Sequence, residues 1–473
     1  MATIPFILPN FTPFSKEETQ TNFPTFNIDF IFIPWHYYHM RSNHTSQQVL
    51  QKKFLTLFQF LKQHRFTILF CFLLILQIFL RTYQLFERAS FGWDQIDSAW
   101  AAKSILVDKQ YFINGPVAKL NSGIYLGPLY FYLITPFYFF TNLDPIASPI
   151  FQAVLSVFSL FVIYFVTKKI FNSSVALVAS AISIFSLSIM NADRIQSAFY
   201  LIVPISYLIF FALVSVVKGK TAYIPFLALF LGLSLQVDFI SVFYPVIILL
   251  CLPFFPRNKQ TLKYSGIGIV ILLLLILPSL IGIFTKHTSS GSFAALFHSS
   301  YHGVHLTRIL QLFHDAFISF GEILQFNILA PFACLLPITF GIVYYIKTPT
   351  KQTLIFFYII GLFIFVPWLI LSTYKGELTD YYFALPKDLA IAMLAFLTVY
   401  LVEKKNMIFK LIPILFWGIY VYTSLTTFFI PSKGNLLDYE KQAKIDFKNK
   451  TIIPFSKYNA EIYLYEVYSH KGK

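Results

Sequence analysis

Long apolar stretches recur along this chain from residue 66 to residue 430. A helix needs about 20 mostly apolar residues to cross a bilayer, and many of these stretches approach that length. Only 12% of the residues are charged, whereas a soluble domain has about a quarter. A chain with so few charges cannot cover a water-facing surface of this size. The sequence therefore predicts an all-α polytopic membrane protein.

Eleven stretches are candidates for transmembrane helices. They are residues 66–83, 147–167, 174–191, 197–217, 222–236, 239–255, 264–284, 327–346, 353–373, 386–402 and 407–429. The fifth and sixth are short and are separated only near Gln236–Asp238, so one longer segment is an alternative there. About eleven transmembrane helices in a domain spanning 66–430 is the prediction.

Basic residues at the ends of these stretches predict the orientation, because Lys and Arg collect on the cytoplasmic side of membrane helices. With eleven spans, all the basic flanks fall on one side. These flanks contain Lys62, Arg65, Lys168, Lys169, Lys218, Lys220, Arg257, Lys259, Lys263, Lys347, Lys351, Lys404 and Lys405. The pattern predicts a plasma-membrane protein with a cytoplasmic N-terminus and an outer-face tail at 431–473. The net charge of +15 then reflects topology, and we expect no nucleic-acid partner.

The parts outside the stretches differ in character. Residues 1–65 are rich in Phe, Pro, Thr and Asn. They form a disordered cytoplasmic extension, or the start is mis-assigned and residues 1–39 precede the true start at Met40. The longest outer loop is predicted at 84–146. Its aromatic run Tyr125–Phe140 would invert every later basic loop if it crossed the membrane, so we expect juxtamembrane helices in the interface.

The segment Phe91–Trp100 (FGWDQIDSAW) carries two carboxylates at the start of this loop. In a helix, Asp94, Asp97 and Ser98 lie on one face, because residues three and four apart are neighbours. Paired carboxylates at a membrane surface suit proton abstraction or cation binding. The alternative is that Asp94 only caps an interfacial helix.

The order of these motifs resembles that of the GT-C glycosyltransferases, which include the protein O-mannosyltransferases and the lipid A aminoarabinose transferases. The resemblance rests on residues 91–100, on 127–136 (GPLYFYLITP) and on 158–171. It implies a GT-C-like fold and a cell-envelope enzyme that moves a sugar from a polyprenyl-phosphate carrier to an outer-face acceptor. It also implies that Asp94 is the catalytic carboxylate.

The chemistry agrees with that implication. A positioned carboxylate can take the proton of an attacking acceptor hydroxyl, with Gln95 and Asp97 beside it to bind substrate. The leaving lipid phosphate needs Arg, Lys or a metal ion to balance its charge. A divalent cation is therefore the one cofactor class left open, although we assign no metal ligands.

The resemblance also implies a second acidic residue after the third stretch, and Asp193-Arg194 stands there. We predict that Asp193 assists catalysis and that Arg194 binds the carrier phosphate; two loop charges at a helix end are the alternative. The aminoarabinose transferases have a Lys before the Pro of the juxtamembrane stretch, but this chain has Gly127. Phosphate binding then falls to Lys119, Arg194 or Lys375.

Three further outer-face residues are candidates for substrate binding. Asp238 lies between the two short stretches, where a carboxylate is costly unless it serves a site or reaches water; a simple turn acid is the alternative. His302 belongs to a loop with His298 and His305 whose spacing is also compatible with a metal site. Tyr382 lies in a tyrosine-rich loop that resembles a late segment of the family near the donor lipid.

The leading hypothesis is an inverting glycosyltransferase that uses a polyprenyl-phosphate sugar. A transporter or lipid-carrier flippase is the alternative from another class, although the sequence has no evident inverted repeat. An inactive GT-C-like scaffold is the third reading, because of Gly127. The sequence identifies neither the sugar nor the acceptor, which is a protein, a lipid or a polysaccharide.

Overall fold

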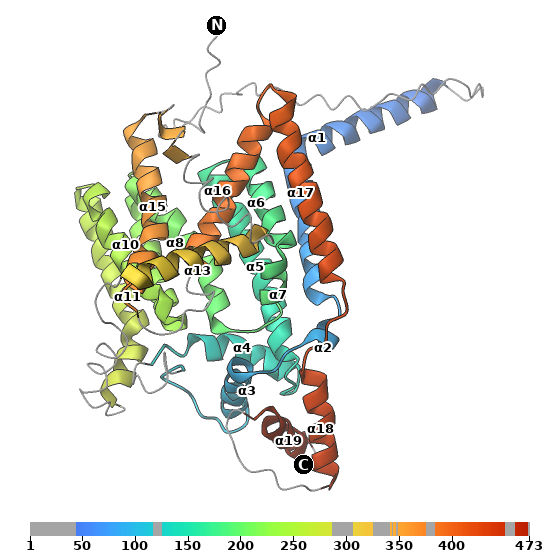
Figure 1. Ribbon diagram of the computed structural model, residues 1–473, viewed down its shortest axis with the longest axis vertical. Helices are drawn as coiled ribbons and strands as arrows, with labels where there is room; N and C mark the ends of the chain where they lie inside the picture. Colours follow the sequence, from blue (N-terminus) through green and yellow to red (C-terminus); the bar gives the residue numbers. More distant parts are fainter. Residues whose placement is uncertain are drawn as a thin grey trace. The chain divides into compact units, whose positions relative to one another are not determined.

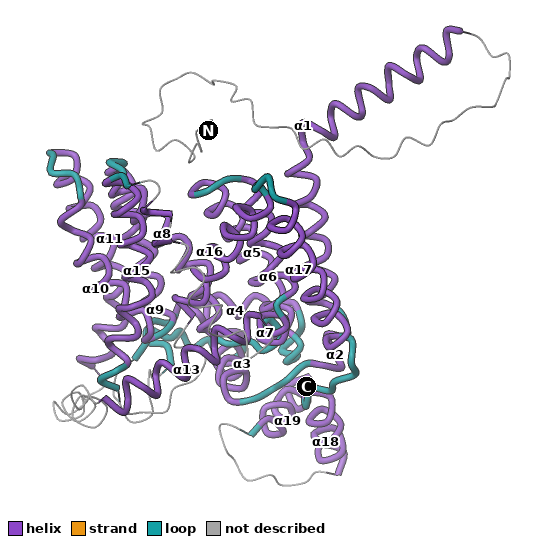
Figure 2. The backbone as a smooth tube through the Cα atoms, turned by 45° about the horizontal axis from the view of Figure 1, so that its top comes forward, coloured by secondary structure: helices purple, strands orange, loops and turns teal. Residues whose placement is uncertain are grey.

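The computed structural model describes residues 44–116, 125–285, 306–324, 341–342, 344–346, 349–374, 384–449 and 459–471. These residues form helices joined by loops (Figures 1 and 2). Contacts divide the chain into Met1–Cys71 and Phe72–Lys473. Helix α1, His44–Thr82, begins in the first unit, so residues 44–65 of the predicted extension are helical.

Six helical segments within the described residues are long and apolar enough to cross a membrane. They are Gln59–Thr82, Ala147–Ile170, Ala198–Val217, Lys259–Gly282, Lys351–Leu371 and Met407–Phe428. Shorter apolar helices are Leu129–Phe140, Ser173–Phe185, Thr221–Val237, Phe239–Phe254 and Leu389–Val402. Each predicted stretch except 327–346 coincides with helix, and most of 327–346 lies outside the described residues. The all-α membrane architecture is confirmed, whereas the number of spans stays a prediction.

One predicted stretch is interrupted, and two neighbouring stretches are separate as predicted. The stretch 174–191 forms α6 (Ser173–Phe185) and α7 (Leu187–Ala192), because Ser186 adopts extended backbone and accepts a hydrogen bond from Ile189 N–H. The fifth and sixth stretches are indeed separate. Helix α9, Ile224–Val237, ends at Asp238, and α10, Phe243–Cys251, follows a 3-10 turn η3 at Phe239–Val242.

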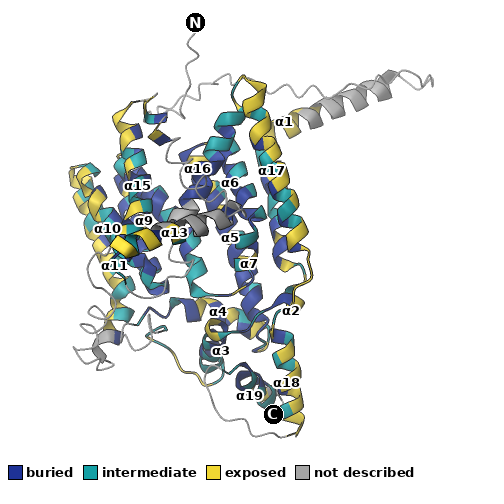
Figure 3. Ribbon diagram, in the orientation of Figure 1, coloured by how far each residue is buried: buried dark blue, intermediate teal, exposed yellow. Residues whose placement is uncertain are grey.

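The long helices differ in how far they are buried. Helix α8, Ile202–Val217, follows the turn η1, Ala198–Leu201. Within this segment, 72% of the residues in its most apolar 18-residue stretch are buried. The corresponding figures are 11% for α11, Lys259–Thr285, and 17% for α17, Met407–Phe428. Figure 3 shows exposed residues along α11 and α17. The high burial of α8 makes it a central helix. The exposed residues of α11 and α17 are largely apolar, as expected of surfaces that face lipid.

The loop after α1 contains α2 (Leu85–Arg88), α3 (Trp93–Leu106) and α4 (Leu129–Phe140). With 12 residues, α4 is too short to cross a bilayer, as predicted for a juxtamembrane helix. The buried faces of α3 and α4 form one apolar core with the start of α5, Ala147–Ile170. Helices α18, Leu436–Asn449, and α19, Ala460–Lys471, contribute to the same core.

The remaining helices complete the second unit. They are η2 (Thr221–Tyr223), η4 (Leu252–Phe254), α13 (Leu306–Leu324), α15 (Lys351–Leu371) and α16 (Ala384–Val402). Figure 1 shows α13 running across the long helices rather than along them.

Candidate active site

Asp94 lies in the first turn of α3, and Gly92 is the residue that caps this helix. The Gly92 N–H donates to Oε1 of Gln95 at 2.8 Å, so the third helical residue satisfies the backbone ahead of the helix. Asp94 is therefore not the cap, contrary to the alternative drawn from the sequence. Its side chain is left for other contacts, at the helix end that favours a negative charge.

The Asp94 carboxylate is exposed, and its Oδ2 accepts a hydrogen bond from the Ser197 hydroxyl at 2.9 Å. Asp97 is half-buried. Ser98 is buried, and its hydroxyl donates to the Asp94 carbonyl oxygen at 2.8 Å. The two carboxylates thus share the accessible start of α3, while Ser98 faces the protein interior.

Gln196 links this helix to its neighbours from a position that is 1% exposed. Its Oε1 accepts from the Ser148 hydroxyl of α5 at 2.5 Å. Its Nε2 donates to Ser98 Oγ at 3.2 Å and to the hydroxyl of Tyr130 in α4. Its carbonyl oxygen accepts from Gln95 Nε2. Because buried polar groups are costly unless paired, this network fixes α3 against α4 and α5.

Gln196 and Ser197 were not predicted from the sequence. An uncharged amide and a hydroxyl in a loop have no distinguishing pattern. The one available signal was their position two and three residues after Arg194, within the segment that the resemblance already pointed to.

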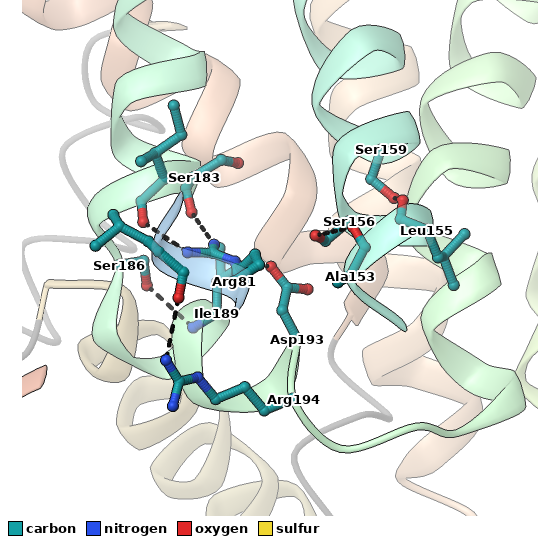
Figure 4. Close-up of polar contacts among 12 residues, drawn as sticks. Arg81, Ala153, Leu155, Ser156, Ser159, Ser183, Ser186, Ile189, Asp193 and Arg194 are labelled. Atoms are coloured by element: carbon teal, nitrogen blue, oxygen red, sulfur yellow. Dashed lines mark hydrogen bonds and ion pairs between the residues drawn. The ribbon is translucent and has the colours of Figure 1, made fainter. Parts of the chain in front are cut away.

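Asp193 has different surroundings. Its Oδ2 lies 2.7 Å from Nε of Arg81, a residue of α1 with a fully buried side chain. Arg81 also donates to the carbonyl oxygens of Ile184 at 3.2 Å and Ser183 at 3.3 Å. Figure 4 shows the Arg81 guanidinium between the Asp193 carboxylate and the backbone of Ser183. Asp193 is thereby tied to a contact between α1 and the end of α6.

Arg81, Arg88 and Arg194 all donate to carbonyls where helices end. Arg88 bonds the Phe428 and Ile430 oxygens after α17, at 2.8 and 3.2 Å. Arg194 bonds the Leu80 and Tyr83 oxygens at the end of α1, at 3.0 and 3.2 Å. The last carbonyls of a helix lack partners and carry partial negative charge, so these bonds stabilise the helix ends.

Arg194 nevertheless has hydrogen-bond donors that these bonds do not use. Its side chain is 7% exposed, and its Nε and Nη1 have no hydrogen-bond partner within the described part of the chain. Burial lowers the pKa of Arg194, and with the smaller effects of the Arg88 and Arg81 charges it is about 10. Arg88 and Arg194 lie with Leu85, Ala89 and Pro149 around a hollow that is too small to admit a water molecule.

Asp238 is the carboxylate that the fold brings near Asp94. Its Oδ1 accepts from Ile240 N–H at 2.9 Å, which caps η3. The pKa of Asp238 is raised to about 6, mainly by burial; the hydrogen bond from Ile240 N–H opposes the rise, and the charge of Asp94 adds to it. The turn-acid alternative is therefore correct as far as the cap is concerned. The charge of Asp94 acts on Asp238 as well, so Asp238 remains a candidate for the same site.

Gly127 has a steric reason to be glycine. A Cβ at this position would lie 2.5 Å from Cγ of Gln236, and Gln236 is itself fixed by a 2.6 Å hydrogen bond from its Nε2 to the Leu275 carbonyl. Gln236 thus fills the space that a side chain at 127 would enter. A lysine at 127 would require the loss of this packing.

Four of the predicted site residues, Lys119, His302, Lys375 and Tyr382, lie outside the described residues, as do His298 and His305. Within the described part, no three His, Cys, Asp or Glu side chains are grouped to hold a metal ion. The divalent cation stays a prediction.

Comparison with known proteins identifies the fold. No protein-family model and no curated protein matches the sequence. The oligosaccharyltransferase of Archaeoglobus fulgidus, solved with zinc and sulfate, matches with a TM-score of 0.54 and 13% identity over 84% of this chain and 57% of its own. The same protein, AglB, in complex with an inhibitory peptide and a dolichol-phosphate gives 0.51 and 12%, over 85% and 60%.

ArnT from Cupriavidus metallidurans bound to undecaprenyl phosphate gives a TM-score of 0.48 and 11% identity, over 86% of this chain and 75% of its own. This chain spans about three fifths of the length of the oligosaccharyltransferase chains. At such identities a likeness shows the fold alone. On the match to the oligosaccharyltransferase, this chain shares the fold of that protein, in agreement with the fold that its motifs predicted.

Proposed function

We propose that this protein transfers a sugar from a polyprenyl-phosphate carrier to an acceptor on the outer face of the plasma membrane, with Asp94 as the general base. The observation that carries the proposal is the environment of Asp94. Its carboxylate is exposed. The helix that carries it is fixed to its neighbours by the buried hydrogen bonds of Gln196 to Ser98 and Tyr130. A base needs both access to substrate and a fixed position.

The reaction follows from this placement. The acceptor hydroxyl gives its proton to the Asp94 carboxylate as its oxygen attacks the anomeric carbon. The bond from that carbon to the phosphate oxygen breaks, and the lipid phosphate leaves with the electron pair. Attack opposite the leaving group inverts the anomeric configuration, and a single base suffices for such a displacement.

The other carboxylates take different parts. Asp238 is coupled to Asp94 and is assigned to orienting the acceptor, together with Gln95 and Asp97. Asp193 is engaged by Arg81, which favours a positioning role over direct proton transfer. Through the loop that continues to Gln196 and Ser197, Asp193 would hold the hydrogen-bond donor of Asp94.

The carrier phosphate is assigned to Arg194, with Arg88, Lys119 and Lys375 as further cations. Nε and Nη1 of Arg194 have no hydrogen-bond partner within the described residues, so each is a charged donor that can bond a phosphate oxygen. The dolichol-phosphate bound by the oligosaccharyltransferase of the same fold supports a polyprenyl phosphate as the carrier class.

The test is Asp94→Asn, which keeps the shape of the side chain and removes the base. Sugar transfer from labelled polyprenyl-phosphate sugars to envelope acceptors should fall by about 10²–10⁴-fold. Thermal unfolding in detergent and binding of polyprenyl phosphate should stay at wild-type values. Asp108→Asn, two residues beyond the C-terminal end of the same helix and 3.7 Å from Lys103 Nζ, is the matched control and should stay active.

Full activity of Asp94→Asn would overturn the proposal. Movement of the carrier lipid across the bilayer without any sugar transfer would support the transporter instead. Incorporation of no label by the wild-type protein, with polyprenyl phosphate still bound, would support the inactive scaffold.

A further inference from the structure

The C-terminal part of the chain packs against the helix that carries Asp94. We propose that residues 434–449 and 459–471, here called the C-terminal clamp, position Asp94 for catalysis. This inference rests on the proposed function, because it concerns the placement of its general base. It goes beyond that function by giving a catalytic task to the tail, for which neither the motifs nor the fold comparisons supply one.

The first connection is a backbone pairing just ahead of α3. Gly434 N–H donates to the Glu87 carbonyl at 2.8 Å, and Leu436 N–H donates to the Ala89 carbonyl at 3.1 Å. In the other direction, Phe91 N–H donates to Oδ1 of Asn435 at 2.6 Å. Phe91 directly precedes the cap residue of α3, so these bonds fix where the helix begins.

Gly434 is specific to this pairing. A Cβ at 434 would collide with the carbonyl oxygen of Ala89. The colliding partner is backbone and not the end of a flexible side chain, so it cannot turn aside. A glycine is needed where two backbones approach this closely, and any other residue would push the segment away from α3.

The second connection is Tyr463 of α19, which is fully buried. Its ring contacts the rings of Phe91 and Trp100, with centroids 5.7 and 5.3 Å away. Its hydroxyl donates to the Leu143 carbonyl at 3.0 Å, just before α5. One side chain of the tail therefore touches the lead-in to α3, the middle of α3 and the approach to α5.

The two carboxylates of the site are consequently held by different parts of the molecule. The clamp and the Gln196 network hold Asp94 through α3. Asp238 instead follows α9, which packs mainly on α11 and α8. Loosening the clamp would move Asp94 relative to Asp238, and a displacement of about 1 Å at a reacting group can cost about 10²-fold in rate.

The experiment compares two buried tyrosines that make the same kind of contact. Tyr420 of α17 is 1% exposed, and its hydroxyl donates to the Ile323 carbonyl at 2.5 Å, so it is the control for Tyr463. Transfer kinetics and thermal unfolding in detergent are measured for Tyr463→Ala, Tyr463→Phe and Tyr420→Ala. Hydrogen exchange of the α3 amides is measured in parallel.

Both alanine variants should unfold at lower temperature, because each removes a buried ring. Only Tyr463→Ala should lower kcat, by about 10–100-fold, with little change in the KM for the donor and with faster exchange in α3. Tyr463→Phe keeps the ring and should recover most of the rate. Gly434→Ala should reproduce the kinetic loss from the other connection.

Wild-type kcat in both Tyr463→Ala and Gly434→Ala would overturn the clamp while leaving the proposed function intact. An equal loss of kcat in Tyr420→Ala would also overturn it, since general destabilisation would then explain the effect. Absence of transfer by the wild-type protein would instead refute the proposed function, and with it the catalytic task of the clamp.

Discussion

Asp94 and Asp193 are both aspartates that the sequence predicts to be catalytic, but their surroundings differ. Asp94 is exposed and accepts a hydrogen bond from a serine hydroxyl. Asp193 has a side chain that is 13% exposed and is paired with a fully buried arginine. That arginine in turn holds the end of α6.

The difference shows that environment, and not residue type, assigns roles to carboxylates. Burial raises the pKa of Asp193, and the Arg81 guanidinium opposes this rise, but the hydrogen bond from Arg81 already occupies its Oδ2. The exposed carboxylate of Asp94 instead stays accessible to substrate. Removing Asp94 should therefore affect activity, and removing the partner of Asp193 should affect folding.

The largest effect on stability should come from Arg81→Ala. This change leaves Asp193 without its cation and two carbonyls at the end of α6 without donors. Losing one partner of a buried ion pair costs about 3–5 kcal/mol, so thermal unfolding in detergent should show a large drop. Asp94→Asn is the matched comparison and should change stability little. Equal stability of Arg81→Ala and wild type would remove the distinction between the two acids.

The next effect concerns pH and Asp238. Its pKa of about 6 predicts that wild-type transfer decreases as pH falls through 6, because Asp238 then loses its charge. Asp238→Asn should lower transfer at pH 7.5 and abolish this acid limb. Asn retains an oxygen to cap η3, so the turn should survive. An unchanged limb in the variant would exclude Asp238 as its origin.

Stability should depend on pH in the opposite sense. The native pKa of Asp238 lies above the usual value of about 3.9, so between about pH 4 and 6 the folded state holds a proton that the unfolded state has released. The contribution of this group to stability therefore falls as pH rises through that window. Asp238→Asn should lack this dependence when unfolding is measured across the same pH range.

The smallest effect is expected for Ser197→Ala. Losing the hydrogen bond to Asp94 removes about 0.5–1.5 kcal/mol of interaction, which corresponds to a rate loss of roughly 2–12-fold. Because both groups reach solvent, unfolding should be unaffected. Ser197→Thr keeps a hydroxyl and should retain more activity. Full activity of Ser197→Ala would show that Asp94 is positioned through α3 alone.

The sequence alone was enough to predict the helical membrane architecture, the break at Asp238 and Asp94 as a candidate general base. These are local properties, since hydropathy over about 20 residues decides whether a segment is an apolar helix. The order of motifs also predicted the GT-C-like fold. The interruption at Ser186 was missed, because a serine between apolar residues barely changes the hydropathy of a segment.

Which side chains contact one another across long sequence distances is known only from the tertiary structure. Ser197 reaches Asp94 across 103 residues of sequence, and Asn435 reaches Phe91 across 344. Local patterns contain no information about such pairs, because they depend on which helix ends the packing brings together. Three other features follow from the three-dimensional packing for the same reason. Arg81 pairs with Asp193, Gln236 fills the space beside Gly127, and the tail packs on α3.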